Sequence, residues 1–243
     1  IAGFGIRSRG SIGGNLMLCH EHQAPDDFFP SDAAIVFTGL EATISVLDVP
    51  SGSTTSYSMP DFFALNMSQK VLVSIFIPYC TDQTEVFQSY KIALRQVMSH
   101  AYVNAAMKVS IDPSTSKITG KPVIAFGGIA VVPTRMAALE SLLVGMSVTD
   151  QTTFSGLASK LQASLTAIVQ PGPKVWGRMP YRVQTAVNYF YKFFVYIQPG
   201  LHPSLSKASQ EWMTRPVTQA TQTFEAPTQA EEPVSIAMPK YDA

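Results

Sequence analysis

The apolar pattern of the chain changes from the period of strands to the period of helices at Pro133, and this change limits the possible folds most strongly. Residues 86–130 contain three strand-like runs, VFQSYKIAL, AYVNAAMKVSI and KPVIAFGGIA, and a turn-like stretch, DPSTSKITG, joins the last two. Helix-like runs follow, namely RMAALESLLVG, a run that begins at Thr149 or Asp150, and residues 181–197. A block of strands followed by a block of helices predicts an α+β fold, in which a three-stranded antiparallel sheet packs with helices.

The first 79 residues are predicted to mix strands with short helices. The segment FPSDAAIVFTGL predicts a helix that is capped by Ser31 and followed by Gly39 as its terminating glycine. Residues 41–48 alternate as a strand, PSGSTTS is typical of a turn, and residues 70–79 predict a second strand that Pro78 ends.

The two ends of the chain differ from the part between them. The chain begins at Ile1 in the middle of a pattern, so we expect it to be a piece of a longer protein. Residues 199–243 are rich in Pro, Gln, Thr, Ala and Ser and hold few large apolar residues, which predicts an extended linker.

Composition and charge argue against several classes of function. The 243 residues carry no formal net charge and only 14% are charged, which argues against nucleic-acid binding. Cys19 and Cys80 are the only cysteines, so neither a disulfide framework nor an iron–sulfur cluster held by this chain alone is expected, and this usage is typical of a reducing compartment. The sequence shows no signal peptide and no apolar stretch of about 18–20 residues, so no membrane span is predicted.

Two glycines interrupt a strand-like run in the stretch RSRGSIGGNL. Because glycine is unfavourable in strands, Gly13 and Gly14 predict a sharp turn or a close approach of the backbone to a ligand. The CHEH motif that follows offers Cys19, His20 and His22 as zinc ligands, but a polar surface loop is the favoured interpretation because no second cluster accompanies them. No catalytic residue and no metal ligand is therefore predicted.

The segment SIGGNL closely resembles the flavin-binding motif of the molybdenum hydroxylases, the family of aldehyde oxidase and xanthine dehydrogenase. Further segments resemble that family in the same order: FPSDAAIVF, VLVSIFIPY, FQSYKIALR followed by YVNAAMKV, AFGGIA, and finally RPVTQATQTFE and PVSIAMPK. The segment FPSDAAIVF is most similar to plant-type aldehyde oxidases. The resemblance implies that residues 1–80 are the rear part of an FAD-binding subdomain, that residues 84–198 are a sheet-and-helix subdomain, and that residues 199–243 lead toward a molybdenum domain.

The same resemblance implies which residues contact FAD. They are Ser11, Ile12, Gly13, Gly14, Asn15, Ser31, Asp32, Leu72, Val73 and Lys91. The glycines would let backbone N–H groups reach phosphate oxygens and ring edges. Asp26 and Asp27 are alternatives to Asp32, and a solvated strand lysine is the alternative interpretation of Lys91. The chain departs from the family in three ways. The loop LMLCHEHQAPDDF is longer than usual and lacks the Thr often found there, and Ile1 stands where relatives have an aromatic residue. The upstream loop that cradles the pyrophosphate in the family is not found in this chain.

The function implied by the resemblance is electron transfer within a larger oxidoreductase. In the family, aldehydes or N-heterocycles are oxidised at molybdenum, and electrons pass through [2Fe–2S] clusters and FAD to O2 or NAD. The iron–sulfur and molybdenum domains of the same parent chain are the implied partners, the molybdopterin and clusters are bound there, and the parent is expected to be a homodimer in the cytoplasm or the peroxisome. This piece alone is expected to be inactive. The alternative is a degenerate, flavin-free domain that only holds partners together.

Overall fold

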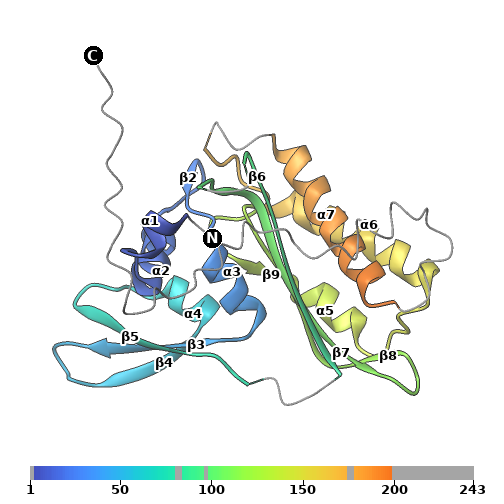
Figure 1. Ribbon diagram of the computed structural model, residues 1–243, viewed down its shortest axis with the longest axis horizontal. Coiled ribbons are helices and arrows are strands. Elements are labelled where there is room, and N and C mark those ends of the chain that lie inside the picture. The colour runs from blue at the N-terminus through green and yellow to red at the C-terminus, as the bar shows by residue number, and fades with distance from the viewer. Residues whose placement is uncertain (1–2, 80–83, 96–97, 174–177, 199–243) are drawn as a thin grey trace, which may run out of the picture.

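The computed structural model describes residues 3–79, 84–95, 98–173 and 178–198 (Figure 1). The helices in these ranges are α1 Phe4–Arg7, α2 Ile12–Glu21, α3 Asp32–Gly39, α4 Met59–Ala64, α5 Ala137–Leu143, α6 Gln151–Ile168 and α7 Met179–Tyr196. The strands are β1 Gln23–Ala24, β2 Asp27–Phe28, β3 Thr43–Asp48, β4 Thr54–Ser58, β5 Lys70–Phe76, β6 Glu85–Ala93, β7 Ala101–Asp112, β8 Lys117–Gly127 and β9 Thr134–Arg135. Every strand pair is antiparallel, and the predicted α+β class is confirmed.

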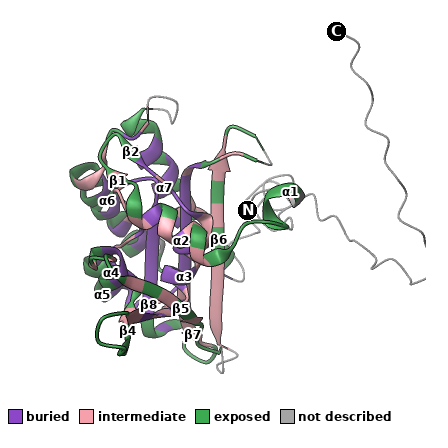
Figure 2. Cartoon of the chain, turned by 90° about the vertical axis from the view of Figure 1, so that its left-hand side faces the viewer, coloured by how far each residue is buried: buried purple, intermediate pink, exposed green. Residues whose placement is uncertain are grey.

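The larger sheet has the strand order β6-β7-β8-β9, so the three predicted strands pair as expected and a short fourth strand extends them. Figure 1 shows α5, α6 and α7 on one side of this sheet and α3 on the other. Figure 2 shows the edge strand β6 as mostly intermediate in burial, whereas α1 is exposed. Because different helices cover the two faces of the sheet, alternate residues of β7 face α5, α6 and α7 on one side and α3 on the other.

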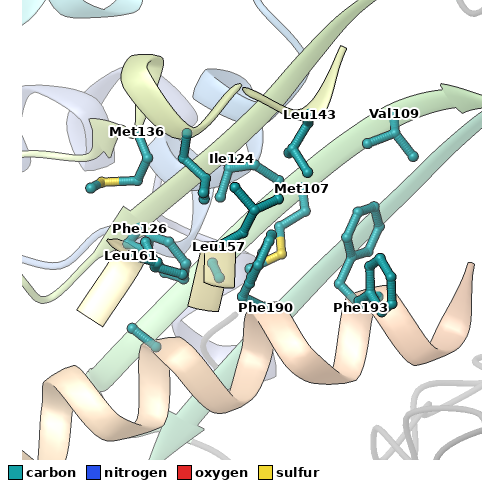
Figure 3. Close-up of a cluster of buried hydrophobic side chains, with 14 of the residues drawn as sticks. Met107, Val109, Ile124, Phe126, Met136, Leu143, Leu157, Leu161, Phe190 and Phe193 are labelled. Carbon is teal, nitrogen blue, oxygen red and sulfur yellow. The ribbon is translucent and has the colours of Figure 1, made fainter. Parts of the chain in front are cut away.

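The main hydrophobic core lies between the larger sheet and the helices α5, α6 and α7. Met107 and Val109 of β7 and Ile124 and Phe126 of β8 belong to this core together with Phe190 of α7 (Figure 3). Phe154 of α6 stacks on Phe190 and Phe194, with ring centroids 5.1 and 3.8 Å away. Each fully buried side chain of this size contributes about 1.5–3 kcal/mol, so this core stabilises the helical layer against the sheet.

The opposite face of the larger sheet is built from small residues where α3 approaches it. Ala106 and Ala125 are fully buried there, and Ile35 of α3 packs against them. A Cβ at Gly39 would lie 2.5 Å from the Cβ of Ala106. Gly39 is the last residue of α3 rather than the terminating glycine after it, so that prediction is wrong. The glycine is needed because the helix lies so close to the sheet.

The smaller sheet, in the order β4-β3-β5, supports a second core with α2, α3 and α4. Ile44 and Val46 of β3 are buried in it together with Phe62 of α4. The predicted strands at residues 41–48 and 70–79 correspond to β3 and β5. The PSGSTTS stretch begins in a turn at Pro50 and Ser51, as predicted, but its last three residues belong to β4.

A fully buried arginine connects the larger sheet with the helical layer. Arg182 of α7 donates hydrogen bonds from its guanidinium to the carbonyl oxygens of Gly128, Gln170 and Pro171. Gly128 follows β8, and the other two residues follow α6. Desolvation lowers the pKa of Arg182, and the three carbonyl oxygens stabilise its charge in place of water.

Several predictions concern residues that the structure does not describe or boundaries that it does not test. The linker predicted at residues 199–243 and the departure at Ile1 lie outside the described residues. The subdomain boundaries at residues 80 and 84 stay a prediction. In the described part of the chain, no helix combines the length and the apolar character that crossing a membrane requires.

Candidate functional site

The glycine pair lies in the first turn of a helix, so the predicted turn in a strand-like run is wrong. Ser11 caps α2, and its Oγ accepts a hydrogen bond of 2.9 Å from the backbone N–H of Gly14. Neither Gly13 nor Gly14 has a positive φ. The first amides of α2, at Ile12 and Gly13, precede the first backbone hydrogen bond of the helix and therefore remain available as donors. The prediction of a sharp bend is thus replaced by a helix N-terminus.

The first turn of α2 lies beside β5. A Cβ at Gly13 would lie 3.9 Å from Cδ2 of Leu72, which packs partly buried against the second core. Val73 is the extra residue at an irregularity in the pairing of β3 with β5, and its side chain is half exposed. The structure therefore places Leu72 beside the first turn of α2, whereas Val73 presents an apolar surface to solvent.

Ser31 joins the N-termini of α2 and α3. Its Oγ accepts a 2.9 Å hydrogen bond from the N–H of Ala34, which caps α3 as predicted, and donates to Oδ1 of Asn15 on α2. Ser31 is only 1% exposed. Its buried side chain therefore links the N-terminal parts of the two helices and does not itself face solvent.

Asp32, the first residue of α3, uses both carboxylate oxygens to contact the larger sheet. Its Oδ2 forms an ion pair with Nζ of Lys91, and its Oδ1 accepts a hydrogen bond of 2.9 Å from Nδ2 of Asn104. Lys91, Asn104 and Gly127 pair directly across β6, β7 and β8, so they form one row on the face toward α3. Asp32 binds two members of this row.

Asn104 occupies the middle of the row and is 1% exposed. Its Nδ2 also lies 3.4 Å from the carbonyl oxygen of Ser31. Its Oδ1 has no hydrogen-bond partner among the described residues and faces Gly127, where a Cβ would lie 2.2 Å away. Sequence reasoning did not single out Asn104, although an asparagine inside the apolar run YVNAAMKV is unusual for a central strand and was the available signal.

The contacts described above bring the predicted site residues from four elements into one continuous region. Gly13 lies near Leu72, Asn15 is hydrogen-bonded to Ser31, and Asp32 forms an ion pair with Lys91. The region offers helix-terminal amides, a lysine ammonium and exposed apolar side chains, which suit phosphate groups and an aromatic ring system respectively. The donor set therefore fits the chemistry of FAD.

The alternative acids and the candidate metal motif lie elsewhere. Asp26 and Asp27 belong to the β1–β2 hairpin, where Oδ2 of Asp27 lies 3.5 Å from Nδ1 of His22. The hydrogen bonds to Lys91 and Asn104 favour Asp32 over both.

The CHEH motif is not a surface loop, contrary to the prediction. Cys19 and His20 belong to α2, and Nε2 of His20 lies 2.7 Å from the carbonyl oxygen of Leu65. Cys19 is buried, and desolvation raises the pKa of its thiol to about 11 although a hydrogen bond with the Ser31 backbone lowers it. No group of three or more His, Cys, Asp or Glu residues suited to a metal ion occurs in the described ranges.

Comparison with known proteins finds similarity over most of the chain. Residues 88–197 match the family described as the CO dehydrogenase flavoprotein C-terminal domain. The abscisic-aldehyde oxidase of Arabidopsis thaliana is 28% identical over 203 residues, which cover 78% of this chain and 14% of that protein. The xanthine dehydrogenase of Emericella nidulans is 28% identical over 199 residues, which cover 79% of this chain and 13% of that protein. The chain thus spans a small part of the length of these relatives.

The fold also resembles solved structures. The carbon monoxide dehydrogenase from Hydrogenophaga pseudoflava, in a form that lacks the Mo-pyranopterin moiety of its molybdenum cofactor, gives a TM-score of 0.63 at 21% identity. The match covers 77% of this chain and 60% of that chain. At this level of identity the likeness concerns the fold.

Proposed function

We propose that this chain, which belongs to the flavoprotein part of the molybdenum hydroxylase family, binds FAD at the region around Gly13, Asp32 and Lys91. The observation that carries the proposal is the ion pair between Asp32 and Lys91, which are 59 positions apart in the sequence. Together with the Asn15–Ser31 hydrogen bond, it joins three elements, α2, α3 and β6, that carry residues assigned to the cofactor by the family resemblance.

The residues of this region would divide the task of holding FAD. Ser11 caps α2 and keeps the amides of Ile12 and Gly13 at the helix N-terminus, where an anionic group is stabilised by the helix dipole. Gly14 leaves room for the capping side chain, because a Cβ at this position would lie only 3.1 Å from Oγ of Ser11.

The part of the region formed by α3, β5 and β6 supplies charge and apolar surface. Lys91 would donate to the cofactor while Asp32 holds its ammonium group in place. Val73 would pack against an aromatic ring, with Leu72 supporting it from the core side. FAD, when bound, supplies a group that accepts two electrons and passes them on.

The activity of the whole protein is part of the same proposal. The parent enzyme would oxidise aldehydes or N-heterocycles, and this chain would be its flavoprotein portion on the electron path from [2Fe–2S] clusters to O2 or NAD. The iron–sulfur and molybdenum domains of the same parent chain would be its partners, in a homodimer located in the cytoplasm or the peroxisome. Without those domains this piece would have no activity of its own.

The first experiment is an absorption spectrum of the purified full-length protein. A visible flavin band that is released as FAD on denaturation is the expected result. A protein that carries no flavin, and gains none when incubated with FAD, would overturn the proposal and favour the flavin-free structural alternative.

Changing Lys91 tests the position of the site. Lys91→Met should weaken FAD binding by roughly 10- to 100-fold, because a hydrogen bond to a charged group contributes about 1.5–3 kcal/mol. Lys121→Met, which removes an exposed lysine of β8, is the matched control and should leave the affinity unchanged. Both values are measured by titrating the flavin-stripped full-length protein with FAD. Equal affinities of the two variants would show that the contact is assigned to the wrong lysine.

A further inference from the structure

The buried side chain of Asn104 is not assigned to any role by the resemblance, and its surroundings fix its orientation. Its Nδ2 lies within hydrogen-bond distance of Oδ1 of Asp32 and of the carbonyl oxygen of Ser31. Turning the amide over would place its Oδ1 against these two acceptors, so the observed orientation is the favourable one. The side chain therefore presents a donor to α3 and its oxygen to Gly127.

This orientation leaves a buried polar atom without a partner among the described residues, namely Oδ1 of Asn104. Burying a polar atom without a hydrogen-bond partner costs free energy of folding. A small apolar residue, such as Ala106 on the same face of β7, would avoid that cost. Gly127 also has to lack a side chain to make room for the amide. Two positions of the sheet are thus adapted to one hydrogen bond with Asp32.

The role of that hydrogen bond follows from what Asp32 does. One carboxylate oxygen, Oδ1, accepts a hydrogen bond from Asn104, and the other, Oδ2, binds Lys91. Asp32 is also the first residue of α3. Without Asn104 the carboxylate could rotate, and the ammonium group of Lys91 would lose its fixed position.

We propose that Asn104 is a positioning residue of the flavin site: it orients Asp32, and through Asp32 it places Lys91 and the first turn of α3. This inference rests on the proposed function and deepens it, since Asn104 is buried and would act through its neighbours and not by touching FAD itself.

The chain offers a matched control on the same strand and the same face. Lys108 lies four residues from Asn104 on β7 and pairs with Glu41, which follows the other end of α3. Lys108→Met therefore weakens the attachment of α3 to the sheet at the end distant from the site. A purely structural role of Asn104 predicts that the two variants behave alike.

The experiment compares Asn104→Ala and Lys108→Met in the full-length protein. Asn104→Ala should weaken FAD affinity by roughly tenfold and change the visible circular dichroism of bound FAD, whereas Lys108→Met should change neither. Asn104→Asp should weaken binding further, because two carboxylates would face each other. Wild-type affinity and an unchanged flavin spectrum in Asn104→Ala, or equal losses in Lys108→Met, would overturn the inference.

Hydrogen exchange separates this inference from the proposed function. In the cofactor-free protein, Asn104→Ala should accelerate exchange at the amides of Ala34 and Ile35, which bond to Ser31 in the first turn of α3. Lys108→Met should leave those amides unchanged. If the wild-type protein binds no FAD, the proposed function fails, but faster exchange at these amides still supports the positioning of α3 by Asn104. Unchanged exchange there would overturn the inference.

Discussion

Gly127 has no side chain because the amide of Asn104 occupies the space in which a Cβ would lie, 2.2 Å from Oδ1. The substitution Gly127→Ala therefore forces Asn104 away from Asp32 or displaces β8. We expect it to lower the free energy of unfolding by about 1–3 kcal/mol, the usual cost of overpacking a core position. Urea denaturation followed by far-ultraviolet circular dichroism measures this change.

Gly156 supplies the control at the same scale. It lies exposed on α6, and a Cβ there would meet nothing within 4 Å. Gly156→Ala should raise stability by about 0.5–1 kcal/mol, because alanine is the better helix former. If Gly127→Ala left stability unchanged or raised it as Gly156→Ala does, the close contact at Gly127 would have no energetic consequence.

The candidate site residues came from the family resemblance, and the reason for the limit of that resemblance is visible at Asn104. The family resemblance named Asp32 and Lys91 from their position in ordered motifs. It gave no information on the contact between them, since a contact between residues 59 positions apart depends on how α3 docks on the sheet. Asn104 was overlooked because its function lies in a cross-strand row with Lys91 and Gly127, and such a row is visible only once the register of the strands is known.

At the scale of elements, the start of α3 depends on Ser31 more than an ordinary helix cap would. Its hydroxyl bonds both the N–H of Ala34 and Oδ1 of Asn15 in a buried setting. Ser31→Ala should therefore cost about 2–3 kcal/mol, the sum of a strong cap and one buried hydrogen bond. Ser58→Ala removes the exposed cap of α4 and should cost only about 1 kcal/mol. Equal costs in urea denaturation would contradict the linking role of Ser31.

Elements with a strong apolar period were predicted well from the sequence, and those without one were not. The strands of the larger sheet and the helices after Pro133 have such a period because each buries one face against the main core. The helix α2 was taken for a strand-like run with a turn because two glycines lower helix propensity at its start. Its cap at Ser11, followed by buried residues at Leu16 and Cys19, was the signal that could have identified it.

The short elements β4 and α4 were also missed because neither shows an apolar period. The strand β4 reads TTSYS and is exposed along most of its length, so it has no apolar alternation. It pairs with β3 through its backbone, which any sequence can provide. The helix α4 carries its own start signals in Ser58 and Pro60, but it is too short for a helical period to be visible.

At the scale of the whole molecule, the two cores are connected by a group of charges beside the contact between α3 and the larger sheet. Glu41, in the connection from α3 to β3, accepts hydrogen bonds from Nζ of Lys108 at 2.9 Å and from Nη1 of Arg135 at 3.1 Å. Arg135 also pairs with Glu140 of α5 at 2.8 Å. These ion pairs join the connection after α3 to β7 and β9 of the larger sheet and, through Arg135, to α5 on its other side.

The connection by Glu41 should make stability depend on pH. Desolvation raises the pKa of Glu41, but the hydrogen bonds and charges of Lys108 and Arg135 outweigh it and hold the pKa below its ordinary value of 4.5. A carboxylate with a lowered pKa in the folded state stabilises the protein fully above its unfolded pKa, and this contribution is lost as the pH falls through the folded pKa. Glu41→Gln should therefore cost about 1 kcal/mol at pH 7, after allowance for solvent screening of a partly exposed group.

The same variant should lose its disadvantage in acid, because a protonated Glu41 and a glutamine are both neutral. The stabilities of Glu41→Gln and the wild-type chain should therefore converge well below pH 4.5. Hydrogen bonds from neighbouring serines lower the pKa of Asp48 and of Asp112 to about 2, and these two groups titrate alike in both proteins. Urea midpoints measured across this pH range test the prediction, with Glu21→Gln, which changes an exposed carboxylate at the end of α2, as the control. A difference between wild type and Glu41→Gln that stayed constant with pH would mean that the side chain acts by packing. Convergence would mean that its charge holds α3 against the sheet, and with it the surface on which Asp32 and Lys91 lie.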